Sequence, residues 1–516
     1  MLLAALSKPM PRYDLASEAS LPLPGLKEDL DPGVVRKALN VSLGANGLLV
    51  FICIGLGAFR DDVASWLVLF GLPAVFVLAF ANGANDCANS VGTIVGAGVL
   101  TMQQALWADA ITELIGALTM GSFVAGTIAG GEVHVESFNE KPIVYSLMML
   151  SIAIAAGATT LLSTFYGYPI SATHAVISGI VAVALCSGVQ DAVNWEGLGW
   201  TVLGWILSPL VGMLAGMAVA YAVQKLVMGT EDPASAAEAR QPLLLSSTAY
   251  VSFLFLLLKG PRPLTNWIGS RYWLAILIPL PFAIFTGYIF TAPSVLHWLR
   301  SALDFIRSGR ATSVLNPATE QSEFDDPYPS SSAESTQTEG LDETQRKFAP
   351  LLIGAGLTVA LAHGGNDVGN AVGPLAVMVD IARTKHVELS PALPSSALFF
   401  GAIAFVVGIL LLGSRTISTV GSKITALTPS RSYCTQLGTA VAVLLSSFME
   451  LPVSTSHCLI GSMIGVSIVE RYCGVADTDL DFSVLTKIVM GWALTIPLAA
   501  ILAVLLFLPL KGILQI

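Results

Sequence analysis

Long apolar stretches recur along this chain of 516 residues, and they constrain its fold more than any other feature. A run of roughly 20 apolar residues is long enough to cross the hydrocarbon core of a bilayer as a helix. The chain is 54% hydrophobic and only 12% charged, and its mean hydropathy is +0.74, whereas about a quarter of the residues in soluble domains are charged. The stretches of this kind are 42–58, 64–82, 103–129, 142–162, 197–225, 273–293, 349–362, 392–413, 432–449 and 482–512.

These stretches predict an all-α, multi-pass membrane protein with about a dozen membrane elements. The stretch 243–259 is shorter, and the sequence leaves open whether it spans the membrane or lies in the interface. The formal net charge of −10 argues against a nucleic-acid partner, because nucleic acid favours clustered Lys and Arg. The N-terminal residues do not resemble an Arg-rich, acid-poor transit peptide, so a plasma-membrane location is favoured over an organellar one.

One polar segment divides the chain into two hydrophobic blocks. Residues 308–347 are rich in Ser, Thr, Glu and Asp and nearly free of aliphatic side chains, a composition that predicts a disordered loop. The predicted organisation is an N-terminal tail, with a further membrane segment as an option, at 1–60, a first transport repeat at 61–225, a connecting region at 226–348 and a second transport repeat at 349–516.

Two motifs occur once in each block and in the same order. The first block contains GANDCANSVGT and then YPISATHAVISG, and the second contains GGNDVGNAVGP and then LPVSTSHCLIGS. The interval is 86 residues from Gly83 to Pro169 and 88 residues from Gly364 to Pro452. Two motifs at nearly equal separation indicate that one half-site was duplicated.

The first motif places an Asn-Asp pair between apolar runs in each block, Asn85-Asp86 and Asn366-Asp367. We predict a broken helix at each pair. A break at membrane depth is tolerated only where it faces protein or a water-filled cavity, and such breaks commonly mark a binding site. An interfacial turn in which Asp86 caps the next helix is the alternative, and the second copy makes it the weaker interpretation.

The second motif begins with Pro in each block and predicts a re-entrant hairpin. A helix that begins at the hairpin tip directs free N–H groups and the positive end of its dipole toward an anion. The alternative is that the hydroxyl groups bond back to preceding carbonyls, but clustering at both tips favours substrate binding. The hydroxyl donors are Ser171, Thr173, Ser454, Thr455 and Ser456.

The distribution of charge indicates how an anion would be held. Between Arg60 and Lys225 the only basic residue is Lys141, so the first block has no Arg clamp. Asp86 and Asp367 would repel an oxyanion in a medium of low dielectric constant. A cation bound between each carboxylate and the substrate removes this conflict, and it predicts cotransport. Oxygen ligands suit a hard cation such as sodium, and the candidate ligands in the two motifs are Asp86, Asn89, Asp367 and Asn370.

Other ionisable residues also lie within or beside apolar segments, where either a functional or a structural role is open to them. Asp109 and Glu113 lie four residues apart, and Glu113 is the preferred cation ligand, with a buried carboxylate satisfied by neighbouring hydroxyls as an equal alternative. His174 and His457 could relay protons, but orientation of the hairpins is favoured. His363 stands alone. Because the sequence has no HExxH motif, an intramembrane zinc hydrolase is unsupported, and we expect neither an enzyme nor a cofactor.

The paired motifs GANDCANSVGT and GGNDVGNAVGP, with the hairpins PISATH and PVSTSH, resemble the inorganic phosphate transporter family of sodium-dependent phosphate symporters. The resemblance covers both halves outside the first 60 residues and the central loop. It implies two inverted repeats, phosphate at their interface, flanking sodium sites and alternating access. The site that it implies contains Asn85, Asp86, Ser171, Thr173, Asn366, Asp367, Ser454, Thr455 and Ser456.

This chain departs from the family pattern at two positions. Ala172 stands where members commonly have a second hydroxyl residue, so the two half-sites are not equivalent. Gln436 stands where animal members typically carry Glu, which makes Gln436 a candidate cation ligand. Because a neutral amide replaces a carboxylate here, the number or the identity of the bound cations can differ from that in those members. The alternatives are a proton-coupled phosphate or sulfate transporter, or a phosphate sensor derived from a transporter. Membrane lipid is an expected partner, and a homodimer is one option for the assembly.

Overall fold

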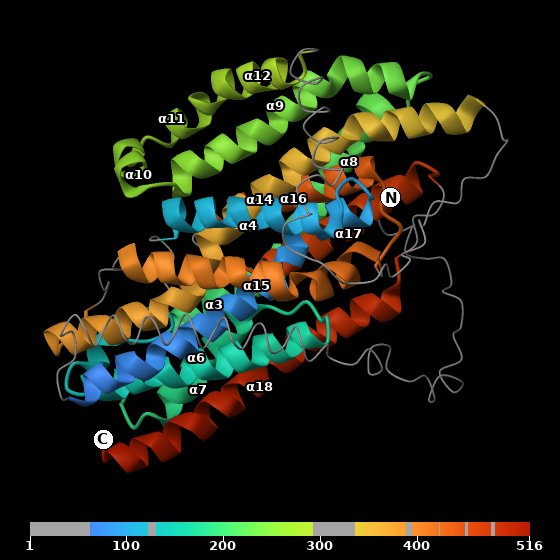
Figure 1. Ribbon diagram of the computed structural model, residues 1–516. Helices are drawn as coiled ribbons and strands as arrows, with labels where there is room; N and C mark the ends of the chain where they lie inside the picture. The colour runs from blue at the N-terminus through green and yellow to red at the C-terminus, as the bar shows by residue number, and fades with distance from the viewer. Residues whose placement is uncertain are drawn as a thin grey trace, which may run out of the picture.

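A computed structural model of the chain describes residues 62–121, 131–292, 336–388, 395–422, 424–448, 453–475 and 480–516. Its regular structure is helical, apart from one isolated antiparallel bridge between Val133 and Val193 among these residues. Most of the long helices lie side by side (Figure 1). The α-helices are α3 (Val63–Gly96), α4 (Met102–Met120), α6 (Pro142–Phe165), α7 (Ala172–Cys186), α8 (Trp195–Val223), α9 (Pro233–Lys259), α10 (Arg262–Ile268), α11 (Tyr272–Leu277), α12 (Pro279–Phe290), α14 (Thr336–Thr384), α15 (Ser395–Ser422), α16 (Pro429–Phe448), α17 (Thr455–Tyr472) and α18 (Phe482–Leu514).

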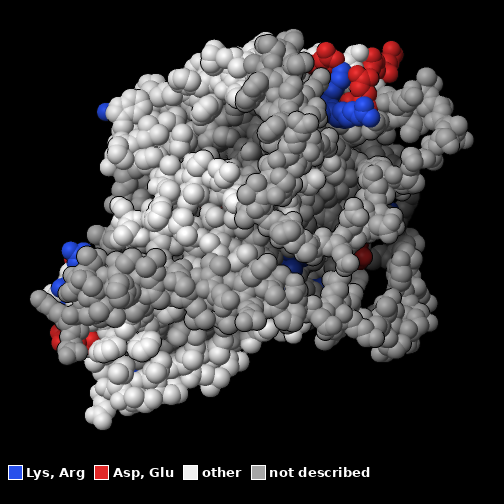
Figure 2. Space-filling model, in the orientation of Figure 1, with Lys and Arg blue, Asp and Glu red and all other residues white. Residues whose placement is uncertain are grey.

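The helices confirm the prediction of a multi-pass membrane protein. Eight helical segments within the described residues are long and apolar enough to cross a membrane. The stretch 243–259 belongs to one of them, α9, which has 27 residues, whereas the stretch 42–58 lies outside the described residues. Figure 2 shows charged side chains mainly at the upper right and along the left edge of the visible described surface, with only a few elsewhere. This pattern fits a protein surrounded by hydrocarbon.

The helices α3 and α14, which carry the two Asn-Asp pairs, pack against each other in antiparallel directions. Gly71, near the start of α3, lies against Met378 near the end of α14. Gly356, in the first part of α14, lies against Ser90 in the last part of α3. Two helices with the same motif therefore cross the protein in opposite directions.

Each half of the chain contributes helices that pack against the other half in matching ways. A Cβ added at Gly83 of α3 would lie 2.3 Å from the carbonyl oxygen of Phe405 in α15, and one at Gly364 of α14 would lie 2.2 Å from the carbonyl oxygen of Glu113 in α4. The hairpin helices α7 and α17 likewise pack on α18 and α8 of the opposite half. The two halves are therefore interlocked. The matched contacts identify α4 of the first half and α15 of the second half as equivalent helices.

The predicted helix breaks at the Asn-Asp pairs are wrong. Both α3 and α14 continue as α-helices through the pairs, so the backbone groups there remain bonded within the helix. The glycines Gly83 and Gly364 instead allow the backbone of a second helix to approach closely. At the Asn-Asp pairs, the polar groups available to bind a ligand are therefore side chains, because the backbone amide and carbonyl groups are bonded within the helices.

The predicted disorder of 308–347 is also wrong over its last part, since 336–347 forms the beginning of α14. Lys347 forms ion pairs with Glu343 at 3.3 Å and with Glu238 of α9 at 2.5 Å. Gln241 Nε2 donates to the Lys347 carbonyl oxygen at 3.0 Å. These contacts with α9 stabilise a polar segment whose composition alone favours disorder. The rest of the predicted loop lies outside the described residues.

Candidate functional site

The two hairpins of the sequence motifs are present, and their tips are buried. After α6 ends at Phe165, a short non-helical segment leads to Ser171, the N-cap residue of α7, whose Oγ accepts a hydrogen bond from the His174 amide at 3.3 Å. In the second half, Ser454 takes the N-cap position of α17 without such a side-chain bond. Ser171 and Ser454 are only 2% and 4% exposed. Pro452, which was predicted to start the second hairpin, lies outside the described residues.

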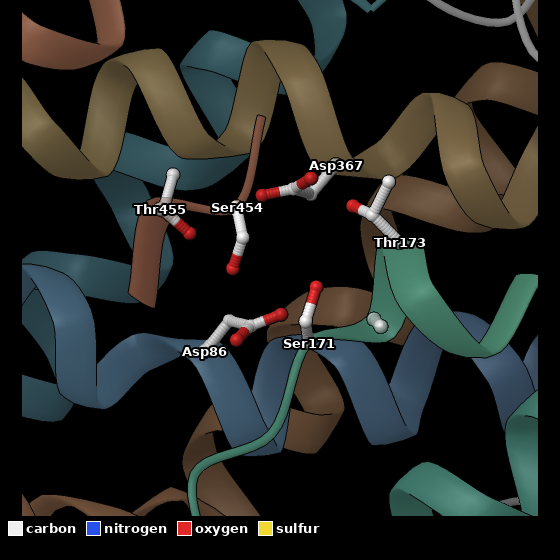
Figure 3. Close-up of a pocket in the computed structure, with 7 residues that line it drawn as sticks. Asp86, Ser171, Thr173, Asp367, Ser454 and Thr455 are labelled. Atoms are coloured by element: carbon white, nitrogen blue, oxygen red, sulfur yellow. The ribbon is translucent and has the colours of Figure 1, made fainter. Parts of the chain in front are cut away.

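The tips and the two central helices enclose one small pocket. Figure 3 shows Asp86 on α3 and Asp367 on α14 at opposite sides, with hydroxyl side chains from both hairpins between them. Helices α7 and α17 both begin here, so their N-termini approach the same space. Among the residues that line this pocket there is no Lys or Arg. The lining residues are Asp86, Ser171, Ala172, Thr173, Asp367, Ser454 and Thr455.

Asn89 and Asn370 connect each aspartate with the hairpin tip of the opposite half. Asn89 Nδ2 lies 3.2 Å from Asp86 Oδ1 and 2.9 Å from Ser456 Oγ. Asn370 Nδ2 lies 2.9 Å from Asp367 Oδ1 and 3.2 Å from Thr173 Oγ1. Asn89 Nδ2 also lies 3.2 Å from the Thr455 hydroxyl. Both amides act as donors in these contacts, so their carbonyl oxygens are the atoms left for a cation.

Asn85 and Asn366, which were predicted to bind substrate, are not among the pocket-lining residues. Asn85 Nδ2 donates to Thr164 Oγ1 and to the Tyr168 carbonyl oxygen, both at 3.0 Å, and its Oδ1 accepts from the Ile170 amide at 2.9 Å. Asn366 Nδ2 reaches Ser447 Oγ at 3.4 Å. Each therefore holds the hairpin of its own half in place.

His363 forms the centre of the ionisable cluster, although the sequence pattern gave it no partner. Its Nδ1 lies 2.8 Å from Glu113 Oε1, and its Nε2 lies 2.7 Å from Asp367 Oδ2 and 3.7 Å from Asp86 Oδ2. The imidazole is completely buried. One signal was available in the sequence: His363 precedes Asp367 by four residues, a spacing that places two side chains side by side on a helix.

The cluster has a donor set that can hold a small cation. One ligand atom from each of Asp86, His363 and Asp367 lies within 4.8 Å of the others. Neither Glu113 nor His363 lines the pocket, but Glu113 contacts His363, which in turn contacts the lining residue Asp367. The alternative weighed for Glu113, a carboxylate satisfied by a hydroxyl, instead describes Asp109, whose Oδ1 accepts from Ser90 Oγ at 2.5 Å.

Gln436 lies beside the cation candidates and does not line the pocket. Its Nε2 donates to the main-chain carbonyl oxygen of Asn89 at 3.1 Å and to Thr93 Oγ1 at 2.7 Å. Its Oε1 is buried without a hydrogen-bond partner among the described residues. The amide thus contacts α3 one turn from Asp86, and its free oxygen is available as a ligand.

We expect Gln436→Glu to lower the sodium concentration that gives half-maximal uptake. The substitution replaces the Nε2 donor that faces the main-chain carbonyl oxygen of Asn89 with a carboxylate oxygen. Because the carboxylate oxygen and the carbonyl oxygen repel each other, a cation or a proton must then lie between them. Because burial opposes the new charge, the gain should be larger at pH 8 than at pH 6. Sodium activation measured at both values tests this, with Gln241→Glu on α9 as a matched control. Identical activation curves for parent and variant would exclude Gln436 from cation binding.

The imidazoles of His174 and His457 meet behind the two hairpin tips. Their ring centroids are 4.8 Å apart, and each ring packs against a tryptophan at a tilted angle with centroids 4.0 Å apart, His174 against Trp205 and His457 against Trp492. His457 Nδ1 also lies 3.1 Å from the Trp205 carbonyl oxygen. These contacts join α7 and α17 to the flanking helices α8 and α18, as expected of residues that orient the hairpins.

Comparison with known proteins agrees with this geometry. A sequence profile of the phosphate transporter family matches residues 82–503. The chain is 31% identical to a Haemophilus influenzae protein named "Putative phosphate permease", over 88% of this chain and 99% of the relative. It is also 31% identical to the inorganic phosphate transporter 2-1, chloroplastic, of Arabidopsis thaliana, over 85% of this chain and 70% of the relative.

A solved structure named "The sodium-dependent phosphate transporter" superimposes with a TM-score of 0.69 at 29% sequence identity. The alignment covers 87% of this chain and 99% of that one. The profile match, which includes both Asn-Asp pairs and both hairpins, and the shared fold lead to one conclusion: this chain belongs to the phosphate transporter family.

Proposed function

We propose that this protein carries inorganic phosphate across a membrane together with sodium ions. The observation that carries the proposal is the pocket, in which two carboxylates and the hydroxyl-bearing tips of two helices converge without a Lys or Arg. Helix N-termini and hydroxyl groups suit a phosphate oxyanion. The carboxylates repel the same anion unless cations neutralise them. Substrate binding therefore depends on cation binding, which is the basis of symport.

Sodium is the cation that the donor set supports best. Apart from the His363 imidazole, the potential ligands near Asp86 and Asp367 are carboxylate, amide and hydroxyl oxygens, and hard cations prefer oxygen ligands. The solved relative is a sodium-dependent transporter by its name, which agrees with this choice. A carboxylate oxygen can also accept the hydrogen of a P–OH group, which sulfate lacks at neutral pH, and this favours phosphate as the substrate.

The same arrangement supports alternating access as the mechanism of transport. The equivalent helices α3 and α14 run antiparallel, as expected for inverted repeats. Asn89 and Asn370 join the aspartate of one half to the hairpin of the other. A movement of the hairpins relative to α3 and α14 can therefore open one shared site to either side in turn.

Uptake of radiolabelled phosphate by the purified protein in liposomes tests the proposal. We expect uptake with an inward sodium gradient and none when choline replaces sodium. Uptake driven by a proton gradient without sodium would instead support the proton-coupled alternative. Stronger competition by sulfate than by unlabelled phosphate would overturn the substrate assignment, and ligand binding without any uptake would support a sensor.

Ser454→Ala should raise the KM for phosphate. A hydrogen bond to a charged group contributes about 1.5–3 kcal/mol, which corresponds to roughly a 10- to 150-fold weaker affinity. Ser454 makes no cap bond, so its removal should leave stability nearly unchanged. Ser171→Ala should raise the KM as well and also lower the melting temperature, because the α7 cap bond to His174 is lost.

Ser151→Ala on α6 is a matched control for these two variants, since this buried hydroxyl donates to the Leu147 carbonyl oxygen. Phosphate saturation curves at a fixed sodium concentration give the three KM values. A Ser454→Ala curve that coincides with the Ser151→Ala curve would show that the tip hydroxyl does not contact phosphate.

A further inference from the structure

Asn82 directly precedes the first Asn-Asp motif. Among the Asn residues in and directly before the two motifs, it alone has a side-chain amide without a hydrogen-bond partner in the described part of the chain. The side chain is completely buried, and neither Oδ1 nor Nδ2 makes a hydrogen bond with the described part of the chain. Asn85, Asn89 and Asn370, by contrast, each use an amide atom to hold an aspartate or a hairpin tip. A buried polar group without a partner costs about 1–3 kcal/mol, so its presence here requires an explanation.

The position of Asn82 on α3 places it next to Asp86, although Asn82 is not itself a pocket-lining residue. It precedes Asp86 by four residues within a continuous helix, and side chains at this spacing are neighbours on one face. Asp86 lines the pocket. The unpartnered amide therefore lies beside a carboxylate that faces the substrate space.

Asn82 is also the counterpart of His363 in the second half. The segments NGAND and HGGND align residue by residue, and Gly83 and Gly364, which follow the two residues, make the same close backbone contact with α15 and α4. His363 Nε2 lies 2.7 Å from Asp367 Oδ2, four residues further along. The first half therefore has an amide where the second half has an imidazole.

This exchange makes the surroundings of the two aspartates chemically different. In the second half, His363 is held by Glu113, and its Nε2 lies 2.7 Å from Asp367 Oδ2 but 3.7 Å from Asp86 Oδ2, so the imidazole pairs with Asp367. In the first half, the matching helix contact comes from Phe405, which offers no polar side chain. Asp86 and Asn82 thus combine a charged oxygen with a neutral amide oxygen, which is a pairing that suits a hard cation.

We propose that Asn82 is a ligand of a co-transported sodium ion that binds against Asp86. The assignment rests on the proposed sodium symport. The amide oxygen faces the ion, and the ion supplies the partner that this oxygen lacks among the described residues. The first half-site then takes an exchangeable cation, while the imidazole of His363 covers the corresponding side of Asp367.

Two substitutions at Asn82 test the assignment in opposite directions. Asn82→Leu keeps the approximate size and removes the ligand, and it should raise the sodium concentration for half-maximal uptake roughly tenfold, as for the loss of one strong contact to a charged group. Asn82→Asp adds a negative charge and should lower that concentration. The KM for phosphate at saturating sodium should change less than about twofold in both, because Asn82 does not contact the substrate.

A second measurement does not depend on transport. Sodium chloride, compared with choline chloride at equal ionic strength and without phosphate, should raise the melting temperature of the purified protein, because a ligand that binds only the folded state stabilises it. This rise should shrink in Asn82→Leu and grow in Asn82→Asp. Ser146→Ala is a matched control, since Ser146 of α6 is also buried without a hydrogen-bond partner among the described residues; its sodium response should equal that of the parent.

The outcomes separate this assignment from the proposed function. If the parent depends on sodium and both Asn82 variants keep its sodium activation and its sodium-induced shift in melting temperature, Asn82 is not a ligand and the assignment is overturned. If the parent itself responds to sodium in neither assay, the proposed sodium symport fails, and the assignment fails with it. Should Asn82→Leu not fold, the response of Asn82→Asp decides the question alone.

Discussion

We expect sodium-driven phosphate uptake to be abolished in both Asp86→Asn and Asp367→Asn, while the protein remains folded. The two carboxylates line the pocket and contribute its negative charge. Asn has nearly the same shape as Asp, so packing is preserved, but the attraction for a cation falls steeply when a unit charge is removed from a medium of low dielectric constant. We expect uptake to fall at least about 100-fold, because a loss of some 3 kcal/mol in cation binding has that effect.

Uptake into liposomes at several sodium concentrations, together with the melting temperature of each variant, checks this expectation. Asp380→Asn on α14 is a matched control, because this aspartate lies on the same helix as Asp367 but is not a pocket-lining residue. Either pocket variant with a normal sodium activation curve would remove the carboxylates from the coupling mechanism. Recovery of uptake at very high sodium would instead show that the charge contributes affinity alone.

The duplicated motifs allowed most of the pocket to be predicted from the sequence. Asp86 and Asp367 were expected near the hydroxyl groups of both hairpins, and these side chains line one pocket. The inference succeeded because two copies of a motif in a membrane protein are best explained by a shared site. The start of the first hairpin helix is predicted less well, because the motif indicates Pro169 as the first helical residue, whereas Ser171 is the N-cap residue of α7.

The helix breaks could not be judged from local sequence, because Gly and Asn within an apolar run are compatible with two structures. Gly83 allows a break, and it also allows a second helix to come within contact of the backbone. The structure has the second arrangement, and the decisive partner, Phe405, lies more than 300 residues further along the chain. The sequence of α3 alone contains no information about that partner.

Distance along the chain also limits what the sequence indicates about Asn85 and His363. Asn85 was grouped with Asp86 as a substrate ligand, but its amide is used by the first hairpin. His363 was left without a partner, yet it bonds Glu113, which is 250 residues away in sequence. Residue type and neighbouring motif identify polar side chains near a site. Which of them face the substrate depends on contacts between the two halves.

The contact of His363 with Glu113 leads to the second large effect that we expect, a loss of both stability and transport in His363→Leu. Removing the imidazole leaves the Glu113 and Asp367 carboxylates buried without their ring donor. Breaking a buried ionic pair by removing one partner costs about 3–5 kcal/mol. We expect a clearly lower melting temperature and no measurable uptake.

The double variant His363→Leu, Glu113→Leu distinguishes this explanation from a simple packing defect. When both members of a buried ionic pair are replaced by apolar residues, the uncompensated charge disappears, and the change is often neutral for stability. The double variant should therefore melt above the His363→Leu single variant although it carries one more substitution, while uptake stays absent because Asp367 has lost its neighbour. Melting curves of the parent, both single variants and the double variant form the required cycle. Additive losses of stability would show that His363 and Glu113 contribute independently, and preserved uptake in the double variant would place both residues outside the transport mechanism.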